Sequence, residues 1–229
     1  MSRVLIILLA FVAGWVDASS FVGLDHVMAA HVTGNLVVLA ANVAEGFEPN
    51  DLLKIAVLPI FFTAVMILTA IHDRLWNHFG DPPRQVAMPL RVEAALIAGT
   101  GFLGIWASLA GWSLGLWTSL VIVTPVLCGM AVQNATHRLY PVIGPATTVM
   151  TGNIAQFFID QTRRIAGRSS VSLINDMPRQ QGLLPFLILA FGTGCVSGAL
   201  LTAALGNGSF LVPALLIAFA SRLPKAKPQ

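Results

Sequence analysis

The stretch VLIILLAFVAGWVDASS, residues 4–20, is apolar for its first thirteen positions and then carries an acid, Asp17. It begins a series of similar apolar runs in a chain of 229 residues whose mean hydropathy is +0.79. Only 10% of the residues are charged, whereas an ordinary soluble domain carries about 25%. So few charges could not cover the surface of a soluble fold, so we expect lipid to be the main solvent.

This composition argues against soluble enzymes, nucleic-acid binders and disordered tails. The sequence contains no basic block, Gly-rich phosphate loop, Gly-x-Ser-x-Gly or His-Glu-x-x-His, so we predict no catalytic residue, cofactor or nucleic-acid partner. Asp25, His26 and His31 do not have the spacing of a compact metal site, and we predict none. Cys128 and Cys195 lie in apolar stretches and are expected to be small buried hydrophobes.

A helix needs roughly 20 apolar residues to cross about 30 Å of hydrocarbon. Six runs are candidate spans, the last of them short: Val4–Leu24, Leu52–Ile71, Leu90–Ala110, Leu114–Val132, Leu183–Leu205 and Phe210–Ser221. Two more apolar stretches, Val27–Ala44 and Val142–Ile159, are interrupted by polar residues and glycine. Each of these either crosses the membrane or re-enters and returns to the same side. In the loop between the second and third spans, we expect Pro82-Pro83 to end a helix.

The distribution of Lys and Arg favours re-entrant segments, because cytoplasmic loops retain positive charge. If all eight segments cross, nine basic residues lie inside and four lie outside, namely Arg74, Arg84, Arg91 and Arg138. If the two interrupted stretches return, only Lys54 lies outside. We therefore predict an all-α polytopic bundle of six spans plus two broken or re-entrant segments. We expect both termini to lie in the cytoplasm.

An internal repeat accompanies this topology. Val32-Thr33-Gly34-Asn35-Leu36 recurs as Met150-Thr151-Gly152-Asn153-Ile154 at an offset of 118 residues, and Val16-Asp17-Ala18 parallels Gln133-Asn134-Ala135 at an offset of 117. In the six-span topology the two halves have opposite orientations. We expect one integral membrane domain over residues 1–229, built from inverted halves at about 1–110 and 114–223.

The Thr-Gly-Asn turns suggest a solute site. Thr can cap a first helical turn, Gly permits close approach, and Asn both donates and accepts hydrogen bonds. A half-helix that starts inside the membrane also points free amide groups at a solute, as in inverted-repeat transporters. We predict a site lined by Asp17, Thr33, Gly34, Asn35, Asn134, Thr151, Gly152 and Asn153. Asp17 and His31 are candidates for gating or proton coupling, because ionisable groups at membrane depth usually have a function.

Helix packing is the alternative interpretation of the same residues. Gly, Thr and Asn also serve as contact residues between membrane helices, without any solute. Gly194-x-x-x-Gly198 has this character most clearly, and it predicts a close-packing seam within the bundle or between subunits.

Two segments resemble a known family. They are Gly14-Trp15-Val16-Asp17-Ala18-Ser19-Ser20-Phe21 and His31-Val32-Thr33-Gly34-Asn35-Leu36-Val37, followed by the second copy at Met150-Thr151-Gly152-Asn153. With these motifs the chain resembles, over nearly its whole length, the YoaK-like family of bacterial inner-membrane proteins, a domain of unknown function. The resemblance implies a polytopic bacterial membrane protein and supplies neither a substrate nor an activity.

The leading hypothesis is therefore a small-solute or ion transporter or channel embedded in the lipid bilayer. Its solute is unknown, and the chain could act as a homo-oligomer. A second hypothesis is an intramembrane enzyme that uses Asp17 and His31 as an acid/base pair on a lipid-soluble substrate. A third is a non-transporting assembly or regulatory protein whose polar repeats only pack helices.

Overall fold

Helices form all the regular secondary structure in the part of the chain that the structure describes. A computed structural model describes residues 3–75, 82–113, 115–140, 145–167 and 181–222. In chain order its elements are α1 (Arg3–Gly23), α2 (Gly34–Glu45), η1 (Pro49–Asp51), α3 (Leu52–Leu75), α4 (Pro82–Leu109), α5 (Leu116–Leu139), α6 (Met150–Ile165), η4 (Gln181–Leu183), α7 (Leu184–Leu205), η5 (Gly206–Phe210) and α8 (Leu211–Ala220). The predicted all-α class is confirmed.

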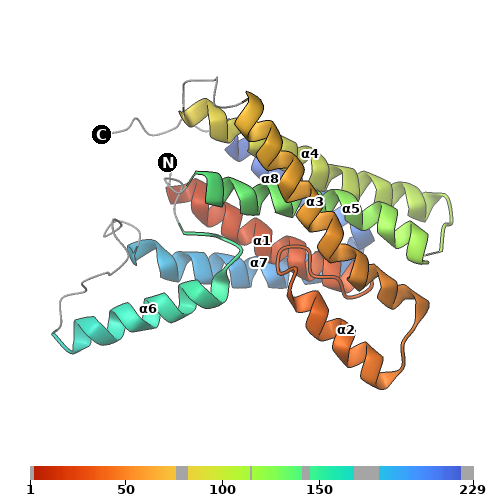
Figure 1. Cartoon of the computed structure of the whole chain (residues 1–229), viewed down its shortest axis with the longest axis horizontal. Coiled ribbons are helices and arrows are strands. Elements are labelled where there is room, and N and C mark those ends of the chain that lie inside the picture. Colours follow the sequence, from red (N-terminus) through yellow and green to blue (C-terminus); the bar gives the residue numbers. More distant parts are fainter. Residues whose placement is uncertain (1–2, 76–81, 114, 141–144, 168–180, 223–229) are drawn as a thin grey trace.

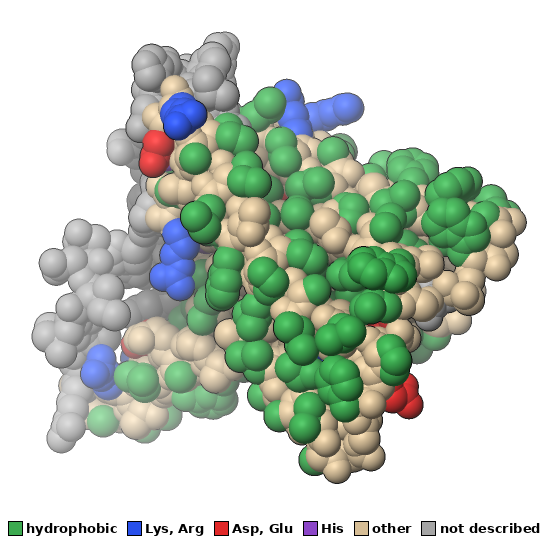
Figure 2. Space-filling view, turned by 45° about the vertical axis from the view of Figure 1, so that its right-hand side comes forward, with side chains coloured by type: hydrophobic (Ala, Val, Ile, Leu, Met, Phe, Trp, Pro, Cys, Tyr) green, Lys and Arg blue, Asp and Glu red, His purple; other side chains and the backbone are tan. Residues whose placement is uncertain are grey.

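Five segments of the described chain are long and apolar enough to cross a membrane: Arg3–Gly23, Pro49–Arg74, Val86–Leu109, Leu116–Leu139 and Leu184–Ala220. Their outward residues are largely hydrophobic, as on the face in Figure 2. A helix closes its backbone hydrogen bonds within itself, so such segments can face lipid without unsatisfied polar groups. The chain is therefore a helical membrane protein.

The fifth of these segments contains a reversal of the chain. Gly206, with φ of 60°, ends α7, and Asn207 lies beside Gly104 near the end of α4. From there α8 runs back along α4, because Leu211 lies next to Gly101 and Arg222 lines the same groove as Arg91. The first and last described residues consequently lie toward the same end of the bundle (Figure 1).

Glycines bring α1 and α7 into close parallel contact. A Cβ atom on Gly14 would stand 2.1 Å from the Phe191 carbonyl oxygen, and one on Gly194 would stand 2.1 Å from that of Phe11. A Cβ atom on Gly198 would likewise stand 2.5 Å from the Trp15 carbonyl oxygen. Only glycine allows two helix backbones to approach this closely. The predicted seam at Gly194-x-x-x-Gly198 therefore lies within the bundle, against α1.

The other long helices pair around this contact. α5 packs in parallel with α3, where the rings of His72 and Tyr140 lie 5.2 Å apart near the ends of both helices. It packs antiparallel to α4, where the Thr100 hydroxyl donates to the Ile122 carbonyl oxygen at 3.1 Å. α8 completes the bundle by packing against both α4 and α1.

The two interrupted stretches form short helices. α2 begins only at Gly34 and α6 only at Met150, and the described residues just before them, 24–33 and 145–149, are not helical. α2 packs against α3, and α6 packs against α7. Figure 1 shows α2 and α6 leaving the bundle toward its opposite ends. Neither stretch is a continuous helix long enough to cross a bilayer by itself.

The prediction that Pro82-Pro83 end a helix is wrong, because α4 begins at Pro82. Proline is compatible with the first helical turn, since an amide N–H there has no intrahelical partner.

The glycine seam makes a testable prediction about stability. Gly194→Ala is expected to destabilise the protein by about 1–3 kcal/mol, because the added methyl group overpacks the contact with Phe11. Gly192→Ala on the same helix has open space around its Cβ position, and should be neutral or stabilising by up to about 1 kcal/mol. Thermal unfolding of the purified protein in detergent measures both. Equal melting temperatures for the two variants would contradict this account of the seam.

Candidate functional site

Asp17 on α1 holds the non-helical segment that precedes α2. Its Oδ1 accepts hydrogen bonds from the backbone N–H groups of Ala30, at 2.6 Å, and His31, at 3.2 Å. Its Oδ2 contacts Nδ1 of the His31 ring. The carboxylate is 10% exposed and the His31 side chain 32% exposed. The predicted pair Asp17 and His31 is therefore a direct contact, and its histidine side is partly accessible.

The surroundings of His31 favour its charged form. The ring also lies against Phe191 of α7, with ring centroids 5.3 Å apart. His31 belongs to the connection between α1 and α2, outside the candidate spans. The hydrogen bond to Asp17 and the negative charge of that carboxylate raise the pKa of His31 above 6.5, against the opposing effect of partial burial. The pair can thus hold or release a proton at the start of α2.

Asn35 closes the same segment from the other side. It is fully buried, its Nδ2 donates to the carbonyl oxygens of Met28 and Val32 at 2.8 and 2.9 Å, and its Oδ1 accepts from the Met28 N–H at 2.9 Å. Backbone groups outside a helix need such partners in a membrane. The amide of Asn35 is therefore used to support the loop.

Asn153 makes the equivalent contact in the second half. Its Nδ2 donates to the Ala146 carbonyl oxygen at 3.0 Å, seven residues back in the chain, as Asn35 does to Met28. The two contacts are related by the offset of 118 residues found in the sequence. The repeated Asn thus closes the turn before a short helix in both copies.

Gln133 on α5 takes the place in the second half that Asp17 has in the first. Its Nε2 donates to Thr147 Oγ1 at 2.7 Å, 14 residues later, and to the Leu9 carbonyl oxygen at 3.0 Å. Thr147 also bonds His137 Nε2 at 3.0 Å. The sequence repeat pairs Asp17 with Asn134, whereas in the structure Gln133 makes the loop contact. Sequence alignment alone could not distinguish two adjacent amides.

The two threonines of the Thr-Gly-Asn turns do not cap their helices. Thr33 is the N-cap residue of α2 without a side-chain capping bond, and α6 begins at Met150, so Thr151 already lies in its first turn. Both side chains are exposed. The expectation of a threonine cap is wrong in both copies, so the two threonine hydroxyls remain open to the surroundings.

The two glycines of these turns differ in their surroundings. A Cβ atom on Gly34 would lie 2.5 Å from the Met28 sulfur, whereas one on Gly152 would lie 3.4 Å from the Val149 side chain.

Sequence reasoning missed Glu93. This residue of α4 is 0% exposed, and among the described residues neither of its carboxylate oxygens has a hydrogen-bond partner. A buried ionised carboxylate without a partner is strongly unfavourable. The signal was present in the sequence, because Glu93 is an acid within the predicted span Leu90–Ala110.

The two loop contacts lie on either side of the middle of α1. The first involves Asp17 and the second reaches Leu9, and eight helical residues correspond to roughly 12 Å along the axis. The polar groups therefore form two neighbouring clusters, one from each half of the chain.

Asp51, another buried acid, lies apart from these clusters. It binds Lys54 at 3.1 Å and also Asn42, and so connects α2 to the start of α3.

Comparisons with known proteins agree with a membrane protein. A family described as "Protein of unknown function (DUF1275)" matches residues 5–222. The chain is similar to the UPF0700 transmembrane protein YoaK of Bacillus subtilis (strain 168), with 26% identity over 161 residues, or 70% of this chain and 68% of that protein. No solved structure matches.

The Asp17–His31 contact makes stability depend on pH. Because the folded-state pKa of His31 is raised, the ion pair contributes fully below about pH 6.5 and is lost as pH rises through the raised pKa. Asp17→Asn can still accept the two backbone hydrogen bonds. Its destabilisation is therefore expected to be larger at pH 6 than at pH 9, measured by thermal unfolding in detergent. A difference from wild type that is constant over this range would show that the ion pair does not form.

Proposed function

The chain belongs to the DUF1275 family of uncharacterised membrane proteins, and we propose that it carries a small solute or an ion across the bilayer. The family assignment confirms the resemblance found in the sequence. Neither the family description nor the name of the relative states an activity, so the proposal rests on geometry.

The observation that carries the proposal is the matching construction of two broken helices. In each half, a side chain of a long helix holds a non-helical segment 14 residues later, through Asp17 and His31 or through Gln133 and Thr147. In each half an Asn then closes the turn before a short helix. Non-helical backbone at membrane depth is tolerated where protein buries it or where it lines a cavity, and it marks the substrate sites of inverted-repeat transporters.

Helix pairing supports an inverted repeat with six crossings. The proposed repeat relates α1 to α5, α2 to α6, α3 to α7 and α4 to α8. Under this relation, the parallel α1–α7 pair corresponds to the parallel α5–α3 pair. The relation also turns the α2–α3 contact into α6–α7 and leaves α4–α8 unchanged. The sixth crossing would be η5 with α8, antiparallel to α4. Charge then assigns the end that carries both termini to the cytoplasm.

We assign two kinds of role to the proposed site. Asp17, Asn35 and Asn153 hold the loops, and the exposed groups at the helix starts face the solute. These groups come from Thr33 and the half-buried Gly34 in the first half and from Thr151 and Gly152 in the second. The half-buried Asn134 of α5 completes the proposed set. Free amide groups in a first helical turn favour an anion or a solute oxygen.

Proton coupling would involve the titratable groups of the bundle. His31 and Asp17 form the gate at the start of α2. Glu93 is a second candidate, because its carboxyl is fully buried within a span and has no hydrogen-bond partner in the described part of the chain.

A second candidate function follows from the direct contact between Asp17 and His31. A carboxylate that orients a histidine can support general acid/base chemistry, and the hydrophobic surroundings would suit a lipid-soluble substrate. Under this alternative, His31→Gln would abolish turnover of such a substrate while leaving any solute flux unchanged.

The proposed topology predicts two accessibilities. Single cysteines at positions 48 and 138, in a protein whose Cys128 and Cys195 are replaced by Ser, should react from opposite sides of the membrane. Glu48 and Arg138 are both exposed and lie at opposite ends of the bundle's long helices. In intact cells, an impermeant maleimide should label position 48 and not position 138. Labelling of both positions, or of position 138 alone, would exclude this orientation.

Transport predicts a measurable flux through purified protein in liposomes. Wild type should conduct at least one member of a panel of small anions, cations and neutral metabolites. Thr33→Val plus Thr151→Val removes only two exposed hydroxyls, so it should change the flux by about tenfold or more without lowering the melting temperature, if these groups bind the solute.

Asn35→Ala plus Asn153→Ala should reduce both flux and stability, because it removes the loop closures. Gln161→Ala, at an exposed position of α6, is the matched control and should behave like wild type. The transport proposal would be contradicted if wild type conducted no solute of the panel, or if both double variants left the flux unchanged. Loss of stability alone would favour an assembly role.

A further inference from the structure

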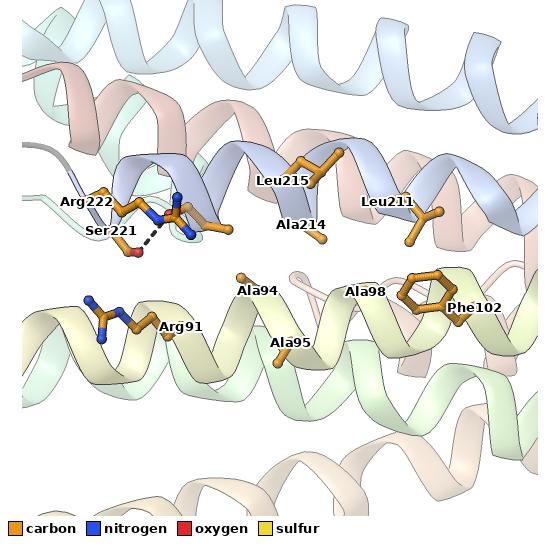
Figure 3. A pocket seen from close by; sticks show the side chains of 11 residues that line it. Arg91, Ala94, Ala95, Ala98, Phe102, Leu211, Ala214, Leu215, Ser221 and Arg222 are labelled. Atoms are coloured by element: carbon orange, nitrogen blue, oxygen red, sulfur yellow. Dashed lines mark hydrogen bonds between the residues drawn. The ribbon is translucent and has the colours of Figure 1, made fainter.

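A groove between α4 and α8 opens on the surface of the bundle. Its volume is about 730 Å³, and its walls are mainly alanine and leucine side chains, including Ala94, Ala98 and Leu215. Arg91 and Arg222 lie together at one end, and Phe102 lies at the other (Figure 3). The groove is thus apolar along its length and positively charged at one end.

Glycines of α4 allow close contact with the start of α8 at one end of the groove. There, a Cβ on Gly104 would lie 2.3 Å from the Asn207 side chain, and one on Gly101 would lie 2.9 Å from that of Leu211. Farther along, the facing positions are Ala94, Ala98 and Ala218, whose methyl groups leave space between the helices. An apolar space of this kind, open to the bilayer, is suited to a hydrocarbon chain.

The length of the groove corresponds to one leaflet. Arg91 and Phe102 are eleven residues apart on α4, or roughly 16 Å at the helical rise. This is about half of the 30 Å hydrocarbon thickness of a bilayer. An acyl chain that starts at the arginines would therefore end near Phe102, close to the middle of the membrane.

Both arginines are available to bind an anion. Each is exposed, and within the described part of the chain no ion pair joins either guanidinium to a carboxylate. The nearby Ser221 hydroxyl donates to the Ala218 carbonyl oxygen at 2.8 Å, and so bonds its own helix (Figure 3). Guanidinium groups bind phosphate oxygens in a forked geometry, so the charged end of the groove complements a phosphate group.

We propose that this groove binds an anionic phospholipid of the leaflet on the side of the two chain termini. One acyl chain lies between α4 and α8, and the phosphate lies between Arg91 and Arg222. Charge complementarity at one end, together with a length of one leaflet, favours this occupant over an apolar helix. The site is separate from the two Thr-Gly-Asn clusters, so the inference does not depend on transport.

Native mass spectrometry of the purified protein tests the lipid site. Phosphatidylglycerol and phosphatidylcholine with identical acyl chains are added at equal concentrations, and the bound fraction of each is measured. Both lipids carry a phosphate, but the choline ammonium of phosphatidylcholine places a positive charge beside the two arginines. Wild type should therefore retain phosphatidylglycerol about tenfold more strongly. Arg91→Gln plus Arg222→Gln should abolish the preference, while Arg138→Gln, at an exposed arginine on α5, should keep it.

A second variant separates the acyl chain from the charge. Ala98→Leu fills the groove and leaves both arginines, so it should lower the binding of both lipids. Ala203→Leu, at an exposed position of α7, is the control and should have no effect. Equal retention of the two lipids by wild type, or a preference that survives the double arginine variant, would overturn the proposal. Unchanged lipid binding in Ala98→Leu, with loss of a dimer, would show that a second copy occupies the groove.

Discussion

Backbone amide and carbonyl groups that leave a helix and are buried away from water must find hydrogen-bond partners within the protein, because an unpaired one is costly. The segments before α2 and α6 both meet this requirement with side chains. Asp17 and Asn35 bond backbone groups of the first segment. In the second segment, Asn153 bonds a backbone carbonyl oxygen and Gln133 bonds the Thr147 side chain. The positions of both short helices, and of the exposed groups at their starts, depend on these few hydrogen bonds.

The glycine contact between α1 and α7 supports the first of these arrangements. α1 carries Asp17, and α7 carries Phe191, against which the His31 ring lies. Because Gly14 and Gly194 allow the two backbones to meet closely, the side chains around the loop are brought into one place. On the other side of the bundle, α4 and α8 meet through glycine at one end only. The same packing rule thus produces a tight seam in one place and an open groove in the other.

Much of the fold could be predicted because its signals are local. Each long helix coincides with an apolar run of the sequence, since a span needs only length and hydrophobicity. Asp17 was also predictable as a polar group at membrane depth that needs a partner. The role of Gln133 was not, because Asn134 is its neighbour and only the rotation of α5 decides which of them faces Thr147. Glu93 was missed although it is an acid within an apolar run, because its complete burial depends on how α4 packs in the bundle.

Composition and local pattern are sufficient to predict the lipid solvent, the helical class and the repeated Thr-Gly-Asn turns. What those turns do depends on the packing of the helices. The Asn amides are used to close loops, and the Thr hydroxyls remain exposed without capping a helix. The same residue types could serve either purpose, and the choice depends on which backbone groups lie within hydrogen-bond distance. That distance is set by the packing of α1, α5 and α7, which no short stretch of the chain contains.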